Sequence, residues 1–176
     1  MCYLVQQRSI TLGGGAKSQA RKKFESIIYN AVNKHVGKTL ILPYTDSIYI
    51  DYDVYQKMFN APLKIVAYVD GECSICLFYV TFWKDFIYEL QNQGHEIQVI
   101  IYANSFYEDN LRNYMASHWD YPWLYDHDKA FVFRNTLYDT RFQTVLVNGN
   151  NTILLIGNPY FNEKLKSLYL KTIKDY

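Results

Sequence analysis

Two apolar runs near the middle of the chain have the length of strands that are buried on both faces of a parallel sheet. They are residues 63–69 (LKIVAYV) and residues 97–103 (IQVIIYA). Between them, apolar residues recur every three or four positions, which predicts a helix over residues 73–91. The recurring positions are Cys76, Val80, Trp83, Ile87 and Leu90. Residues 63–103 therefore predict a strand–helix–strand unit with a right-handed crossover.

The segments after this unit predict a helix, a hairpin and a closing helix. Residues 109–119 have helical spacing, residues 122–126 (PWLYD) continue in extended form, and Asp128 is placed to cap one short helical stretch. Two β runs within residues 144–156 are joined by Asn, Gly, Asn and Asn, which predicts a hairpin. From Pro159 onward, apolar residues alternate with Lys and Glu as in an amphipathic helix.

The segments before the unit are less regular. Residues 1–17 show no sustained period and predict a flexible tether. A helix is predicted from Ser18 to a stop near Gly37. Its apolar face would hold Ala20, Phe24, Ile27, Ile28 and Ala31. Residues 39–42 predict a short strand, and residues 46–62 predict a second short strand followed by a turn or short helix.

Composition limits the class of protein. A chain of 176 residues with 49% hydrophobic and 20% charged residues predicts one globular domain with its own core. A formal net charge of +1 gives no overall attraction to nucleic acid. No window approaches the ~20 apolar residues of a membrane helix. The aromatic content of 18% fits large core side chains, with a binding groove as the alternative.

The candidate chemistry lies in "GECSIC", where Cys73 and Cys76 stand at the start of the central helix. Thiol–disulfide exchange needs a thiolate, whereas a free cysteine with a pKa near ~8.5 is mostly protonated at neutral pH. The free N–H groups and the dipole at a helix N-terminus favour negative charge, so Cys73 is expected to be the more acidic thiol. Cys76 lies one turn further along, on the same side of the helix.

This order of elements around a Cys-x-x-Cys motif resembles the thioredoxin fold. The lead-in "VGKTLILP" is similar to that of the membrane-tethered, extracytoplasmic thiol-disulfide oxidoreductases of bacteria. The resemblance covers Val36 to Tyr176 and implies an α/β, thioredoxin-like fold with a central mixed β-sheet flanked by helices. We therefore expect a tether over residues 1–17 and one domain over residues 18–176, with an N-terminal helical extension to about residue 37.

The resemblance also implies an activity. Cys73 would attack, Cys76 would resolve the mixed disulfide, and the partners would be protein thiols or disulfides. No cofactor beyond the cysteine pair, no nucleic acid and no defined oligomer are expected. The loop of Phe142, Gln143 and Thr144 would face the substrate.

Two positions depart from the family pattern. A buried carboxylate is expected six residues before the first cysteine, and that place is held by Ala67; Asp70 and Glu72 are the candidate substitutes for proton transfer. Gln143 takes the place of the family's cis-proline. Because a cis bond at a residue other than proline costs ~2.5 to 4 kcal/mol, we expect a trans bond there, with the Gln143 amide close to the sulfurs.

Other interpretations remain open from the residues alone. The pair could be a structural disulfide, two idle buried thiols or half of a zinc site, although Cys2 is the only other cysteine and no paired histidines are present. The "DHD" of residues 126–128 suggests a metal, but helix capping with solvent exposure fits three adjacent residues better. The glycine-rich segments do not match a phosphate-binding loop.

The predicted cellular location of the protein rests on Cys2. The first fifteen residues lack the basic and apolar regions of a secretion signal. A cysteine followed by a polar tether is typical of processed bacterial lipoproteins, so we expect a signal encoded upstream, a periplasmic or cell-envelope location and a membrane tether through Cys2. The alternative is an ordinary second residue. The competing function is a non-catalytic thioredoxin-like binding module of a cell-envelope lipoprotein, stapled by a structural disulfide.

Overall fold

The computed structural model describes residues 14–45 and 51–176, and within them five strands form one mixed sheet in the order β3-β2-β1-β4-β5. Strands β1, β2 and β3 are parallel, whereas β4 runs antiparallel to β1 and β5 antiparallel to β4. The strands are β1 (Leu63–Asp70), β2 (Ile97–Asn104), β3 (Leu124–Tyr125), β4 (Thr144–Asn148) and β5 (Ile153–Ile156). The strand–helix–strand unit and the hairpin predicted from the sequence are confirmed.

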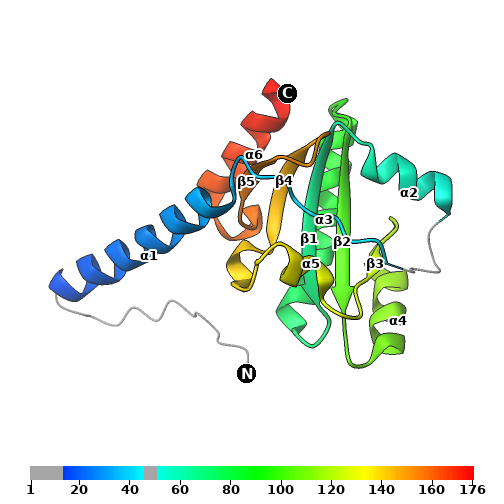
Figure 1. The fold of residues 1–176 in the computed structure, drawn as a ribbon, viewed down its shortest axis with the longest axis horizontal. Coiled ribbons are helices and arrows are strands. Elements are labelled where there is room, and N and C mark those ends of the chain that lie inside the picture. Colours follow the sequence, from blue (N-terminus) through cyan, green and yellow to red (C-terminus); the bar gives the residue numbers. More distant parts are fainter. Residues whose placement is uncertain (1–13, 46–50) are drawn as a thin grey trace.

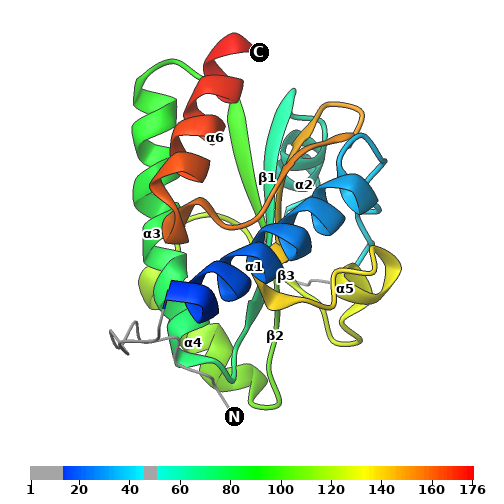
Figure 2. The same ribbon diagram turned by 90° about the vertical axis from the view of Figure 1, so that its left-hand side faces the viewer.

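Helices cover both faces of the sheet, as Figure 2 shows. On one face, α3 (Ser74–Asn92), α4 (Glu108–His118) and α6 (Glu163–Asp175) pack on Ile65 and Ala67 of β1. On the other face, α2 (Tyr52–Phe59) and α5 (Ala130–Arg134) pack with Val66 of β1 and its neighbours. The continuous apolar sequence of β1 follows from this arrangement, because successive side chains enter two different cores.

Helix α1 (Gly14–His35) begins inside the segment predicted as a tether, so residues 14–17 are helical. The rest of that predicted tether, residues 1–13, lies outside the described residues. Of the predicted apolar face, Ala31 is buried, whereas Phe24 is 49% exposed. Figure 1 shows why: α1 projects away from the sheet, and its C-terminal end lies next to β5. The positive φ of Gly37 follows shortly after the helix ends, as the sequence predicts.

The prediction of a strand over residues 39–42 is wrong in its length, because only Thr39 pairs as a strand residue does. A single antiparallel bridge joins Thr39 to Thr152, beside the hairpin. Of the strand and turn or short helix predicted over residues 46–62, residues 46–50 lie outside the described part, and α2 occupies residues 52–59. Two short 3-10 helices, η1 (Thr140–Phe142) and η2 (Pro159–Phe161), precede β4 and α6.

The cap of α5 corrects a second prediction. Asp128, the expected cap, is exposed and contacts His127. Asp126 performs this role instead, because its carboxylate accepts hydrogen bonds from Ala130 N–H at 2.8 Å and from Phe131 N–H at 2.9 Å. Asp126 is buried, so the solvent exposure predicted for this motif is wrong at that residue.

The described helices give no sign of a membrane span. None of those within residues 14–45 and 51–176 is both long enough and apolar enough to cross a bilayer.

Candidate active site

The two cysteines lie where β1 ends and α3 begins, and they form a disulfide with their Cα atoms 5.1 Å apart. Cys73 is the N-cap residue of α3, and its carbonyl accepts hydrogen bonds from Cys76 N–H at 2.9 Å and Leu77 N–H at 3.1 Å. Both cysteines are half-buried, and Cys76 packs against the core below α3. Cys73 therefore sits at the positive end of a helix of 19 residues.

The first turn of α3 carries no acidic residue. Backbone N–H groups at a helix start lack acceptors one turn earlier and carry partial positive charge, and in α3 the N–H of Cys76 donates to the carbonyl of Cys73, the capping residue. A thiolate at Cys73 would be stabilised by these groups without competition from a carboxylate in that turn.

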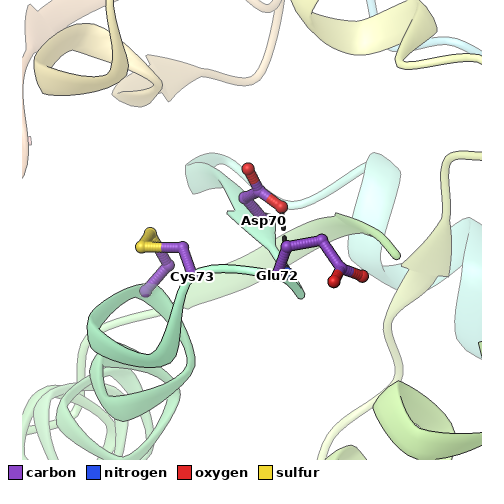
Figure 3. The surroundings of a disulfide bond; sticks show 4 residues. Asp70, Glu72 and Cys73 are labelled. Atoms are coloured by element: carbon purple, nitrogen blue, oxygen red, sulfur yellow. Dashed lines mark hydrogen bonds between the residues drawn. A yellow bond between two sulfur atoms is a disulfide. The ribbon is translucent and has the colours of Figure 1, made fainter. Parts of the chain in front are cut away.

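The two carboxylates predicted for proton transfer make contacts within or beside the loop (Figure 3). Asp70 Oδ1 accepts a hydrogen bond from Glu72 N–H at 3.1 Å. Figure 3 shows the Glu72 carboxylate directed away from the sulfur of Cys73. Glu72 Oε1 accepts hydrogen bonds from Ser105 Oγ at 2.6 Å and from Phe106 N–H at 2.9 Å. The bond from Ser105 lowers the pKa of Glu72, which makes this carboxylate a weaker proton acceptor.

Gly71 allows the cysteine loop to approach the end of β2 closely. Its N–H donates to Asn104 O at 2.7 Å. A Cβ at this position would lie 2.7 Å from Ser105 Cβ and 2.9 Å from Asn104 O, which is too close for any side chain. Sequence reasoning missed both Ser105 and this close approach, because they depend on residues at the end of a different strand, β2.

Aromatic side chains gather beside the first turns of α3. Phe78 is 53% exposed and lies 6.4 Å from Tyr160 of η2, measured between ring centroids. Tyr160 also contacts Phe82 at 5.0 Å and Tyr79 at 4.9 Å, and Phe161 lies 4.7 Å from Tyr79. The sequence signal was the i, i+4 spacing of Phe78 and Phe82, which alone does not reveal the partner from η2.

Solved structures share the fold of this chain. No protein-family model matches the sequence, and no curated protein matches it. A domain from Cytophaga hutchinsonii described as a possible thiol-disulfide isomerase is 21% identical, with a TM-score of 0.56; the match covers 80% of this chain and 97% of that one. The thioredoxin domain of a thiol-disulfide oxidoreductase from Bacteroides vulgatus is 13% identical, with a TM-score of 0.52 and coverage of 65% and 81%. The C-terminal domain of an uncharacterized protein from Bacteroides fragilis is 19% identical, with a TM-score of 0.55 and coverage of 78% and 98%.

The chain has a thioredoxin-like fold. This confirms the predicted fold class, a central mixed sheet flanked by helices with a helical extension at the N-terminal side.

One departure from the thioredoxin-like pattern is the missing carboxylate below the cysteines. Ala67 is buried in the same core that Cys76 contacts. The buried carboxylate of Asp126 does not replace it. Burial raises the pKa of Asp126, but its oxygens bond to the α5 backbone. Burial raises the pKa of the Tyr68 hydroxyl, with smaller contributions from Asp70 and Asp126, and Tyr68 borders the other core.

The second departure is the loop before β4. No cis peptide bond occurs within residues 14–45 and 51–176, which agrees with the trans bond expected at Gln143. The Gln143 carbonyl accepts a hydrogen bond from Tyr68 N–H at 2.9 Å, and its Nε2 donates to Leu137 O at 3.0 Å. The side-chain amide is thus bonded to the segment between α5 and η1, and a contact with the sulfurs stays a prediction.

The neighbours of Gln143 differ in exposure. Thr144 is 5% exposed and pairs with Ala67 in the sheet. Phe142 is half-buried, packs against the second core and lies under the guanidinium of Arg141, 5.6 Å from its ring centroid. Of the three residues predicted to face a substrate, Thr144 therefore offers the least accessible side chain.

Metal ligands do not gather in the described part of the chain. Across residues 14–45 and 51–176, no group of three or more His, Cys, Asp or Glu side chains is arranged to hold a metal ion.

Proposed function

We propose that this protein is a thiol-disulfide oxidoreductase that acts on the cysteines of other proteins through Cys73 and Cys76. The observation that carries the proposal is the position of Cys73 as the N-cap of α3, one helical turn from its disulfide partner. The thioredoxin-like fold and the thiol-disulfide activities named for two of its structural neighbours support it.

The cycle follows from the chemistry of the pair. In the reduced protein, the Cys73 thiolate attacks one sulfur of a substrate disulfide, forms a mixed disulfide and releases one substrate thiolate. The Cys76 thiol then loses its proton to water and attacks Cys73 Sγ, which releases the second substrate thiolate. The pair has lost two electrons to the substrate, and the reverse sequence oxidises a substrate dithiol.

The substrate would lie over the surface that surrounds the pair. Phe142 of η1 and Gln143 at its end are expected to border it, with the backbone of Thr144 at the start of β4 behind them. Exposed Phe78 and Phe161 add an apolar border on the helical side. Such a border favours an extended or unfolded segment with apolar residues next to its cysteine.

The proposed site of action is the periplasm or cell envelope, with Cys2 as a lipid attachment point. A standing disulfide of this kind persists in oxidising compartments. Fractionation of the source cells, probed with an antibody, should place the chain with the envelope. Recovery of the full-length chain from the cytosol alone would contradict this location.

Alkylation rates measured against pH test the activity. With the reduced protein and each cysteine resolved by mass spectrometry, we expect Cys73 to react with a pKa well below the ~8.5 of a free cysteine, because the helix terminus stabilises its thiolate. Cys76 should stay protected by its packing. Equal reactivity of both thiols at an ordinary pKa would refute a catalytic role.

A non-catalytic binding module is the second candidate. Ala67 in place of a buried carboxylate favours it, because the resolving thiol then has no proton acceptor beneath it. In that case the disulfide would staple the start of α3. The same alkylation measurement separates the two functions, since a structural pair needs no acidic thiol.

A further inference from the structure

The carboxylate of Glu72 is next to the proposed nucleophile in sequence, and the structure fixes its position. Ser105 Oγ and Phe106 N–H both donate to Glu72 Oε1, at 2.6 and 2.9 Å. Figure 3 shows the bonded carboxylate directed away from the sulfur of Cys73. Glu72 itself is exposed, so water alone would leave its side chain free to sample many rotamers.

Ser105 is held much more firmly than its partner. It is 7% exposed, its Oγ accepts a hydrogen bond from Tyr107 N–H at 2.9 Å, and its carbonyl accepts one from Tyr125 Oη at 2.8 Å. The close approach of Gly71 to Asn104 joins the same two loops. The buried hydroxyl therefore determines where the exposed carboxylate lies.

This position matters because like charges disfavour one another. A carboxylate that approaches a thiolate raises the pKa of the thiol and destabilises the reduced form of the pair. The other charged groups around Glu72 are Asp70 on its own loop and Lys129 before α5, and Glu108 at the start of α4 shares the neighbour Tyr125 with Glu72. Of these, Asp70 is already bonded to the Glu72 backbone.

We propose that Ser105 is a positioning residue for thiol–disulfide exchange, which holds the Glu72 carboxylate away from Cys73 and so keeps the Cys73 thiolate stable. The inference rests on the proposed function of the pair. It predicts that releasing Glu72 makes the Cys73 thiol less acidic and the disulfide harder to reduce.

The test compares the full chain with S105A, E72Q and the double variant. For S105A we expect at least about a threefold fall in the ionisation constant of the Cys73 thiol. The equilibrium constant for reduction of the disulfide by glutathione should fall by a similar factor, about 14 mV for a two-electron couple. In the E72Q background, S105A should change neither quantity, because the amide carries no charge.

A further variant keeps Ser105 intact. In E72D the carboxylate is one methylene shorter and cannot keep the same bond to Ser105, so the Cys73 thiol should again become less acidic. This variant separates the position of the charge from any defect caused by the loss of the hydroxyl.

The outcomes are distinct. Equal shifts from S105A with and without the Glu72 charge, or no shift in either, would overturn the positioning role while leaving an acidic Cys73 and the proposed function in place. Ordinary reactivity of both cysteines in the unmodified protein would overturn the function and the positioning role together.

Discussion

Strand β1 has a charged side chain near its start and another just past its end, and the two are held in opposite ways. Lys64 is buried, and its Nζ donates to the carbonyls of Phe59, Ala61 and Gly149 at 3.0 to 3.3 Å. Glu72 is exposed and is bonded by a single buried hydroxyl and one backbone N–H. Burial lowers the pKa of Lys64, whereas hydrogen bonds lower that of Glu72.

This difference suggests that Lys64 serves the stability of the fold, whereas Glu72 serves the chemistry of the cysteines. Lys64 joins the end of α2 to the turn of the hairpin, so its charge satisfies backbone groups that have little access to water. Glu72 remains in solvent, so the loss of its hydrogen bonds would cost little folding free energy. Substitution of Lys64 should therefore alter the free energy of unfolding, and substitution of Glu72 should alter the reactivity of the cysteines.

Replacing Lys64 should have the largest effect. K64M keeps the length of the side chain but leaves three carbonyls without their donor, and we expect the free energy of unfolding to fall by about 3 kcal/mol. For a chain of this size the melting temperature should fall by about 6 to 12 °C. Thermal denaturation followed by circular dichroism measures this change.

Lys57 provides the control for that prediction, because it is exposed on α2. K57M should change the free energy of unfolding by less than about 0.5 kcal/mol. Alkylation of the reduced cysteines should be the same in both variants and in the unmodified chain. A large change in Cys73 reactivity in folded K64M would show that the two ends of β1 are coupled.

A smaller effect is expected at Gln143, which pairs with β1 beside the cysteine end. Its φ of −81° lies close to the range of proline. Q143P should raise the rate of insulin disulfide reduction about threefold, equivalent to about 0.7 kcal/mol of barrier, if the ring restores a substrate-facing backbone like that of the family.

The matched control is Q143A, which also removes the hydrogen bond to Leu137 but adds no ring. It should lower stability by about 1 kcal/mol and leave the reduction rate unchanged. A folded Q143P with unaltered activity would mean that this loop does not limit the reaction.

The sequence predicted the parts of the fold that depend on local pattern. The two central strands, α3 and the hairpin carry a clear apolar period or turn signal, and all were found. The cap of α5 was misassigned within "DHD", because the choice between Asp126 and Asp128 depends on which carboxylate the packing of α5 buries.

The site was predicted less completely. Cys73 and Cys76 were recognisable because helix start and spacing are both visible in sequence. The contact of Glu72 with Ser105 spans 33 positions and arises only when the ends of β1 and β2 come together as parallel neighbours. Hydroxyl–carboxylate pairs of this kind leave no periodic pattern in the sequence, so this contact could be identified only from the structure.

The bridge at Thr39 also bears on how the protein behaves in concentrated solution. Residues 37–40 bond to the hairpin through Gly37 N–H, Leu40 N–H and the carbonyl of Lys38, and so cover part of the outer side of β5. At the opposite side of the sheet, β3 is only two residues long. The unpaired N–H and C=O groups of an open strand edge can pair with another chain and so start aggregation. The covered part of β5 and the short β3 both reduce the open edge with which a second copy could pair.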